Sequence, residues 1–314
     1  MSDDMSSAVG TSDEVDTVQR SLSTGLPAWC SYRGVTCDST SGSATYASVT
    51  QIMLLSLSLV GTIPSSIGSL TSLTYLHLGA NSLSGTIPSS IGSLTLLQYI
   101  ELGSNSLHGA IPSSVGSMVS LQTLYLNTNS LSGTIPSSIG SLISLTALNF
   151  FINSLAGTIP SSIGLLTSLS GLHLDRNSLH GTIPSSIGSL SSLTYLSFGT
   201  NILTGTIPSS IGSLTLLLEL YLDTNLLVGA IPSTFSKLIN LSGLRLNTNY
   251  LTMGSATTVP TSTFSSATLS GTLVLSSNCL AFTYGSNSVS VTHCAPTSGK
   301  SIIMYEYEYV LSRL

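Results

Sequence analysis

Residues 61–84 read GTIPSSIGSLTSLTYLHLGANSLS, and this 24-residue unit repeats through most of the chain. Further copies or near-copies of its first ten residues begin at Gly85, Gly109, Gly133, Gly157, Gly181, Gly205 and Gly229. All eight copies follow one another at 24-residue steps, with no insertion or deletion. A fixed period of this length is the signature of a solenoid, in which each unit packs only against its neighbours.

The second half of the unit follows the pattern LxxLxLxxNxL, as in Leu73, Leu76, Leu78, Asn81 and Leu83. The LxL alternation predicts a short strand with two leucines on its buried face, and stacking joins these faces into one core. The asparagine stands where the chain leaves the strand, so its amide can satisfy backbone groups that the turn leaves unpaired. We therefore expect a structural ladder made of Asn81, Asn105, Asn129, Asn153, Asn177, Asn201, Asn225 and Asn249.

The composition excludes several classes of function. Only 6% of the 314 residues are charged and the net charge is −5, so the chain lacks the basic surface that nucleic-acid binding needs. No run of roughly 18 or more apolar residues indicates a transmembrane helix. His173 and Asp175 lie two residues apart beside Arg176, but no nucleophile or third ligand accompanies them. We therefore expect no catalytic activity, no cofactor and no metal site.

The consensus LxxLxLxxNxLxGxIPxxIGxL resembles the plant-type leucine-rich repeat found in receptor-like-kinase ectodomains and polygalacturonase-inhibiting proteins. The resemblance covers about residues 26–294. It implies an α/β solenoid, a superhelical horseshoe with a parallel β-sheet on the concave face and short or 3-10 segments on the convex face. It also implies disulfide-capped ends, and ligands that bind on the concave side or along an adjoining flank. Neither a glycine-rich phosphate loop nor a kinase catalytic-loop motif occurs in the chain.

Four cysteines stand near the two ends of the repeats. Cys30 and Cys37 match the N-terminal cap of the family, since Cys37 is the last residue of the motif GVTC. This match implies a disulfide between them. The tryptophan that usually stands between the two cysteines is missing, with Tyr32 nearby. Cys279 and Cys294 follow a last degenerate unit and are expected to form a second bridge. The alternative is four reduced thiols in a reducing compartment.

The expected organisation has five parts. Residues 1–10 are a disordered N-terminus, and residues 11–48 form the N-terminal cap, in which Thr11 and Glu14 fit a capping box that opens a short helix. Residues 49–252 are regular repeats, residues 253–296 an irregular last repeat with the C-terminal cap, and residues 297–314 a tail. The start of the chain has no basic and apolar secretory signal. We nevertheless expect an extracellular or cell-surface protein, because of the cysteines, and a monomer or weak dimer.

Candidate binding residues are the positions that vary between otherwise uniform repeats. The strand residue between two core leucines is almost unconstrained, and of the seven charged residues between 49 and 252 only Lys237 falls off the expected concave face. Tyrosines gather on the same face. The candidate ligand-binding residues are Tyr75, His77, Tyr99, Glu101, Tyr125, Asn149, Phe151, His173, Asp175, Arg176, Tyr195, Glu219, Tyr221, Asp223 and Arg245.

Two functions of different class remain open. Exposed aromatics beside carboxylates and amides suit a non-catalytic module that binds a protein, peptide or glycan. The alternative is a structural or surface-adsorbing protein, for example an ice-binding one, that uses regular small polar residues. Its motive is a threonine ladder formed by Thr62, Thr86, Thr134, Thr158, Thr182 and Thr206, which Ala110 and Ala230 interrupt. His108 and His180, which precede glycines of the repeat, are expected in exposed loops.

Overall fold

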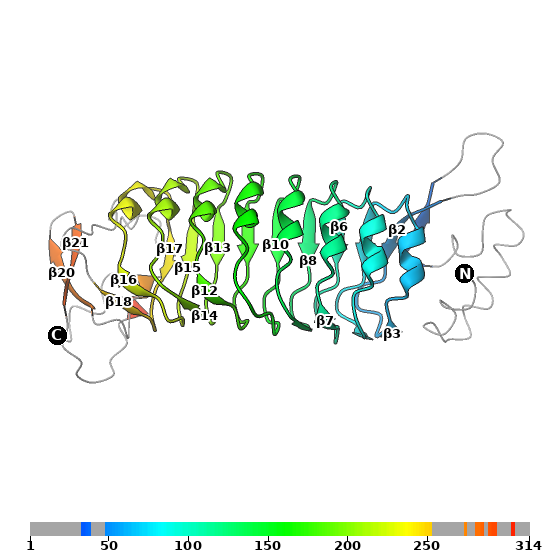
Figure 1. The fold of residues 1–314 in the computed structure, drawn as a ribbon, viewed down its shortest axis with the longest axis horizontal. Helices are drawn as coiled ribbons and strands as arrows, with labels where there is room; N and C mark the ends of the chain where they lie inside the picture. The colour runs from blue at the N-terminus through cyan, green and yellow to red at the C-terminus, as the bar shows by residue number, and fades with distance from the viewer. Residues whose placement is uncertain are drawn as a thin grey trace, which may run out of the picture. The chain divides into compact units, whose positions relative to one another are not determined.

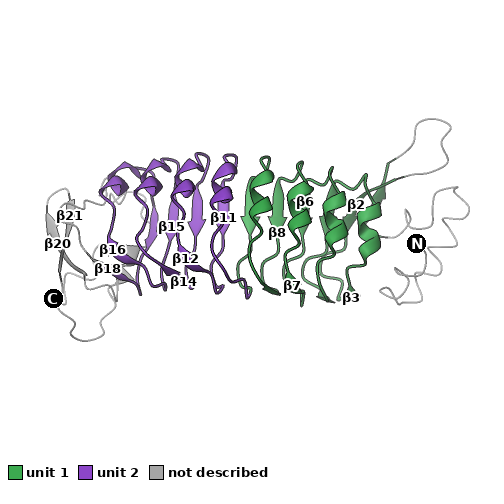
Figure 2. Cartoon of the chain, viewed as in Figure 1, with its two compact units in different colours: residues 1–153 green, residues 154–314 purple. Residues whose placement is uncertain are grey.

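A computed structural model describes residues 33–38 and 48–252, together with four short strands further along the chain. The chain divides into two compact units, residues 1–153 and 154–314 (Figure 2). Both are built from the same 24-residue element, in which a strand, a turn, a flank segment and a 3-10 helix follow one another (Figure 1). The solenoid with a parallel sheet and 3-10 turns on its convex face is thus confirmed.

The sheet of unit 1 has the order β1-β2-β4-β6-β8-β10. Its strands are β1 (Val35–Cys37), β2 (Val49–Met53), β4 (Tyr75–His77), β6 (Tyr99–Glu101), β8 (Thr123–Tyr125) and β10 (Ala147–Asn149). β1 pairs with β2 in antiparallel fashion, and the other strands are parallel. Equivalent residues of successive repeats pair with each other, as in Leu76 with Ile100. Side chains of one repeat position therefore form continuous rows across the sheet.

The sheet of unit 2 follows the same rule. Its parallel strands are β11 (Gly171–His173), β13 (Tyr195–Ser197), β15 (Glu219–Tyr221), β17 (Gly243–Arg245) and β19 (Leu273–Val274). β22 (Ile303–Met304) runs antiparallel to β19, and β20 (Leu280–Gly285) and β21 (Ser288–His293) form a separate antiparallel pair.

Each GxIP element leads into one 3-10 helix on the side opposite the sheet. These helices are η2 (Ser65–Ser69), η3 (Ser89–Ser93), η4 (Ser113–Ser117), η5 (Ser137–Ser141), η6 (Ser161–Leu165), η7 (Ser185–Ser189), η8 (Ser209–Ser213) and η9 (Ser233–Lys237). A proline precedes every one of them, and Pro64 has φ −73° and ψ 148°. Proline suits a helix start because the missing N–H would have no helical partner there. It therefore fixes where the chain turns back toward the sheet.

A second set of short parallel strands lines the flank of the repeats, and the sequence did not predict it. The pairs are β3 (Val60–Thr62) with β5 (Ser82–Ser84), β7 (His108–Ala110) with β9 (Ser130–Ser132), β12 (His180–Thr182) with β14 (Ile202–Thr204), and β16 (Val228–Ala230) with β18 (Tyr250–Thr252). His108 and His180 are exposed as expected, but they lie in these strands and not in loops. The expectation failed because the bonds that make the strands join different repeats, as from the His108 N–H to the Gly85 carbonyl.

The core is a stack of equivalent leucines and isoleucines. Leu76, Leu124 and Leu196 are at most 1% exposed. Phe150, Phe198 and Phe235 are completely buried and stand where other repeats carry aliphatic side chains. Stability of such a stack comes from contacts between neighbouring repeats rather than from one central core.

Much of the expected capping lies outside the described residues. Cys37 is disulfide-bonded, but Cys30, Cys279, Cys294 and the helix expected after Thr11 fall outside the described part. The pairing Cys30–Cys37 and the second bridge therefore stay predictions. Among the described residues, no helix has the length and hydropathy needed to cross a bilayer.

Candidate ligand-binding surface

The asparagine ladder fixes the turn at the end of each sheet strand. In repeat after repeat the amide nitrogen donates to carbonyls of its own and the preceding repeat, as Asn105 does to Leu102 and Leu78, both at 3.0 Å. Its oxygen accepts the Leu83 N–H at 2.9 Å. The residue before the asparagine is left-handed, with φ between 52° and 55° at Ala80, Ser104 and Ile152. The ladder offsets this strain by satisfying the turn's backbone groups, which would otherwise be buried unpaired.

The exposed side of each sheet, which we call the sheet face, carries three rows of side chains. The first and third residues of each strand point outward, and the residue two places later continues onto the turn. In unit 1 the rows are Tyr75, Tyr99, Thr123, Ala147; His77, Glu101, Tyr125, Asn149; and Gly79, Gly103, Asn127, Phe151. In unit 2 they are Gly171, Tyr195, Glu219, Gly243; His173, Ser197, Tyr221, Arg245; and Asp175, Gly199, Asp223, Asn247.

Three tyrosines form one cluster on the sheet face of unit 1. The rings of Tyr75 and Tyr99 are stacked, with centroids 4.3 Å apart and planes 5° from parallel. Tyr125 meets Tyr99 edge to face at 6.3 Å, and His77 lies 6.0 Å from Tyr99. Both geometries are favourable for aromatic pairs. The four rings lie next to one another and make a half-exposed aromatic surface.

Glu101 lies beside these rings, over a hollow left by glycine. Its Oε1 accepts the Gly103 N–H at 2.6 Å. A Cβ on Gly103 would stand 2.5 Å from that oxygen and 2.7 Å from the Asn127 Oδ1, so a larger residue here would displace the ends of both side chains. Burial raises the pKa of Glu101, and the Gly103 N–H opposes this shift. Burial likewise raises the pKa of Tyr99 and Tyr125, with Tyr75 and Glu101 adding to the effect on Tyr99.

Unit 2 has its own cluster, in which charge is more prominent. His173 stacks on Tyr195 at 4.2 Å, and Tyr221 meets Tyr195 edge to face at 5.5 Å. The Tyr221 hydroxyl donates to the Glu219 carboxylate. The Arg245 guanidinium carbon lies 4.4 Å from the Tyr221 ring centroid, a cation–π contact. The tyrosine therefore has a cation on its face and a carboxylate at its hydroxyl.

Two further carboxylates flank Gly199 in unit 2. A Cβ on Gly199 would stand 2.9 Å from the Asp223 Oδ1, so glycine again makes room for a carboxylate. Burial raises the pKa of Asp175 and of Asp223, and hydrogen bonds and the nearby arginines oppose the shift. Burial lowers the pKa of His173, against the opposing effect of Glu219. Half-buried charges of this kind are costly unless a partner neutralises them.

The structure thus places the candidate residues of each unit on its sheet face, with some differences from expectation. Ser197, the third residue of β13, is only 3% exposed although it stands in a row of the sheet face. The Asn149 Oδ1 is occupied by the Phe151 N–H at 3.0 Å. Arg176 occupies the left-handed turn position, with φ 55°. The sequence did not predict a role for Gly103, Gly199 or Asn127. These residues occupy the same repeat position as Phe151, Asp175 and Asp223, and the variation at that position was the signal that could have found them.

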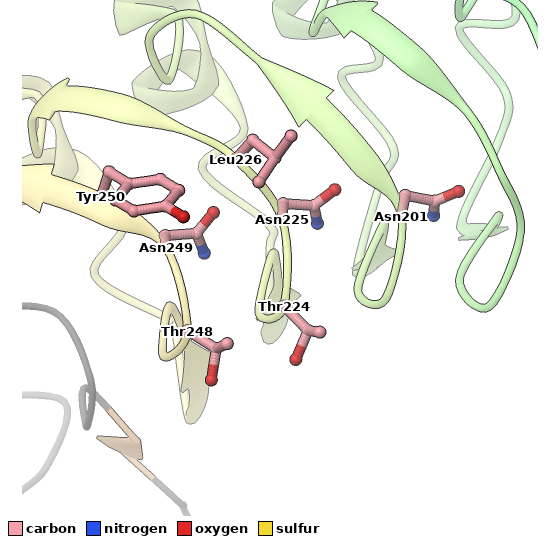
Figure 3. A pocket seen from close by; sticks show the side chains of 7 residues that line it. All are labelled: Asn201, Thr224, Asn225, Leu226, Thr248, Asn249 and Tyr250. Carbon is pink, nitrogen blue, oxygen red and sulfur yellow. The ribbon is translucent and has the colours of Figure 1, made fainter. Parts of the chain in front are cut away.

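A recess of about 320 Å³ on the flank of unit 2 was also missed (Figure 3). It is lined by Asn201, Thr224, Asn225, Leu226, Thr248, Asn249 and Tyr250. Leu226 and Tyr250 are 41% and 66% exposed. Five earlier repeats carry serine at the same position, directly after the ladder asparagine, so the replacement by large apolar residues was a readable signal. Within the described residues, no group of three or more His, Cys, Asp or Glu side chains could hold a metal ion.

Comparison with known proteins supports the reading of the repeat. The family model described as Leucine Rich Repeat matches residues 72–94, 120–142, 168–190 and 192–214. The chain contains plant-type leucine-rich repeats. It is similar to the ectodomain of the Arabidopsis thaliana membrane receptor kinase GASSHO1/SCHENGEN3, solved with CASPARIAN STRIP INTEGRITY FACTOR 2, at 37% identity and a TM-score of 0.69. The match covers 76% of this chain and 30% of that one.

Two other solved structures are informative about this leucine-rich-repeat chain. The ectodomain of the Arabidopsis receptor kinase HAESA, in complex with an IDA peptide hormone, is 35% identical over 77% of this chain and 42% of its own, with a TM-score of 0.63. A plant ice-binding protein is 26% identical over 85% of both chains, with a TM-score of 0.65. The chain spans about a third of the length of the first receptor ectodomains it matches. No curated protein sequence matches it.

Proposed function

We propose that this chain is a recognition module that binds its ligand on the sheet face. The ligand is a peptide, a peptide-like segment of a protein, or a glycan. The observation that carries the proposal is the contrast between a uniform scaffold and one variable face. Between residues 49 and 252, six of the seven charged residues lie on the sheet face or its turn, and only Lys237 lies elsewhere. Solubility alone does not require charged and aromatic side chains to be concentrated on one face.

The energetics of the sheet face support the same proposal. Stacked and edge-to-face rings present a large apolar area that is already rigid, so little conformational entropy is lost when a ligand covers it. The half-buried carboxylates Glu101, Asp175 and Asp223 are partly desolvated before binding, which favours a ligand that supplies donors or positive charge. Receptor ectodomains similar to this chain were solved with peptide hormones.

An extracellular location belongs to the same proposal. Cys37 is disulfide-bonded, and stable disulfides are typical of oxidising compartments. The similar receptor chains are ectodomains of membrane receptor kinases. We infer that the chain works outside the cell or at its surface, where peptide and wall-glycan ligands are found.

Binding can be tested by isothermal titration calorimetry against a panel of secreted peptides and wall oligosaccharides. The paired substitution of Tyr99 and Tyr125 by alanine should abolish binding in unit 1, and that of Tyr195 and Tyr221 should do so in unit 2. The matched control replaces the flank residues Thr86 and Thr182 by alanine. If a bound ligand is retained by both tyrosine double variants while circular dichroism shows intact folds, the sheet face is not the binding surface.

Adsorption to ice is the second candidate function, and one flank observation favours it. A Cβ on Gly85 or Gly205 would lie 2.8 Å from the Cγ2 of Thr62 or Thr182, so each methyl packs on the glycine of the next repeat. The threonines therefore take the same orientation in successive repeats, roughly 4.8 Å apart. Their side chains are exposed, and their hydroxyls have no hydrogen-bond partner in the part of the chain that the structure describes.

The relevant measurement is thermal hysteresis together with inhibition of ice recrystallisation. If the flank adsorbs to ice, Thr182→Lys and Thr206→Lys should abolish both effects, and the sheet-face double variants should keep them. A wild-type protein without either effect would remove this candidate and leave peptide recognition unaffected.

A further inference from the structure

The two units treat their central tyrosine differently. In unit 2, Tyr221 on β15 pairs in register with Arg245 on β17, and the guanidinium covers the tyrosine ring at 4.4 Å. The cation is supplied by the chain itself. The contact joins neighbouring strands at the third position of each, so a tyrosine at this strand position can hold a guanidinium on its ring.

Unit 1 has the same tyrosine without the cation. Tyr125 is also the third residue of its strand and also meets the preceding tyrosine edge to face. The position that corresponds to Arg245 holds Asn149, which is short and whose Oδ1 accepts the Phe151 N–H. Among the described residues of unit 1, no cation lies over Tyr75, Tyr99 or Tyr125.

The charge of unit 1 calls for a positive partner. Glu101 is the only formally charged residue between positions 48 and 153. It pairs in register with Tyr125, and the two side chains are close enough on the sheet face for the carboxylate to act electrostatically on the tyrosine. Oε1 accepts the Gly103 N–H, and no described residue donates to Oε2. The result is a half-buried carboxylate next to an electron-rich ring, with no cation in reach among the residues that the structure describes.

We propose that unit 1 binds an arginine side chain of a basic peptide at Tyr125 and Glu101, with the guanidinium over the tyrosine ring and its N–H groups on the carboxylate. The geometry favours arginine over lysine because a planar guanidinium can stack and donate to a carboxylate at the same time. This inference rests on the proposed function, because it takes the sheet face to be the recognition surface, and it adds the chemistry of the ligand.

Calorimetric titration with acetyl-Arg-Arg-Arg-amide tests the inference, with the lysine and glutamate tripeptides as comparison probes. The arginine peptide should bind with one site per chain, the lysine peptide more weakly, and the glutamate peptide not at all. Glu101→Gln keeps the acceptor for Gly103 and should weaken binding about tenfold, and Tyr125→Ala should do the same. The control Asp38→Asn removes an exposed carboxylate of unit 1 that lies outside the rows of the sheet face, keeps the acceptor for the Ser48 N–H, and should leave the affinity unchanged.

A gain-of-site variant separates this inference from general acidity. Arg245→Ala uncovers Tyr221 and should raise the stoichiometry from one peptide to two. Equal affinity of the wild type and Glu101→Gln, or equal binding of arginine and glutamate peptides, would overturn the inference. An uncharged ligand that binds the wild type and is lost in the Tyr99→Ala, Tyr125→Ala double variant would overturn the arginine site and leave the proposed function standing.

Discussion

Gly92, in η3, lies against Ser114 of the next repeat so closely that a Cβ on Gly92 would stand 2.3 Å from the Ser114 carbonyl oxygen. The same approach recurs between Gly68 and Ser90 and between Gly116 and Ser138. The serine partner is itself held, because the Ser114 hydroxyl donates to the Ser89 carbonyl at 2.6 Å. The 3-10 glycines therefore set how closely successive repeats can stack.

Gly92→Ala should destabilise the protein, because the new methyl group meets backbone that cannot move without separating two repeats. Overpacking of this kind costs about 1–3 kcal/mol. Chemical denaturation followed by circular dichroism would measure the change in unfolding free energy. Ser93→Ala, on the exposed end of the same helix, is the matched control and should stay within about 0.5 kcal/mol of the wild type. Equal stability of the two variants would show that the repeats can separate at little cost.

Asn225→Ala should be at least as damaging, for a different reason. Its amide nitrogen donates to the Phe198 carbonyl at 3.0 Å and the Leu222 carbonyl at 3.2 Å, and its oxygen accepts the Leu203 N–H at 3.0 Å. The side chain is only 5% exposed, so the substitution leaves buried backbone groups without partners. We expect a loss of at least about 3 kcal/mol, because three backbone groups lose their partner at roughly 1–3 kcal/mol each.

Asn127→Ala is the matched control for the ladder. Asn127 is partly exposed on the sheet face, and no described residue hydrogen-bonds to its side chain in the way that Asn225 is bonded. Thermal melts of the two variants should therefore differ clearly, with only Asn225→Ala lowering the midpoint. If Asn127→Ala were equally destabilising, the asparagines would act through general packing rather than through the ladder bonds.

Those parts of the fold that depend on the period could be predicted from the sequence. The alternation Leu76-x-Leu78 gave the strand, and the position of Asn105 after it gave the turn, because both are local patterns that recur every 24 residues. The flank strands could not be predicted in the same way. Their bonds, such as that from the His108 N–H to the Gly85 carbonyl, join residues of neighbouring repeats, and a three-residue alternation such as Ser82–Ser84 is too short to predict a strand.

The rows of the candidate site could be predicted from the sequence, but the burial of the individual side chains in them could not. The register placed Tyr99, Tyr125 and Glu101 on one face, as expected. Burial within that face depends on which side chains lie next to one another. Ser197 is buried, and its hydroxyl interacts with Asp175 of the preceding repeat and with Tyr195 of its own strand. The space at Gly103 and at Gly199 could not be predicted for the same reason. It is occupied by the carboxylates of other residues, Glu101 and Asp223.

The oxidation state of the cysteines tests the expected caps and the proposed location together. Protein from its natural source, denatured and treated with a thiol reagent before and after reduction, should show no free thiols at first and four afterwards, as counted by mass spectrometry. Peptide mapping of the unreduced protein should recover Cys37 linked to Cys30. Four free thiols at the outset would contradict the disulfide at Cys37 and direct the search for ligands to intracellular peptides.

Glu101→Gln should make unit 1 more stable near neutral pH, and the size of this gain should depend on pH in a defined direction. Burial raises the folded-state pKa of Glu101 above its ordinary value, so the folded protein binds more protons than the unfolded chain between the two pKa values, and the wild type loses stability as the pH rises through that window. Glutamine keeps the acceptor for the Gly103 N–H but carries no charge to desolvate.

Denaturation at a series of pH values should show a higher free energy of unfolding for the variant than for the wild type at pH 7. This difference should vanish below the unfolded pKa of about 4.3, where the wild-type carboxyl is protonated in both states. Saturating arginine peptide should reverse the order at pH 7, because it binds the wild type more tightly than the glutamine variant and therefore stabilises the wild type more. A variant that is less stable than the wild type at pH 7 without peptide would mean that Glu101 already has a cation partner within the chain.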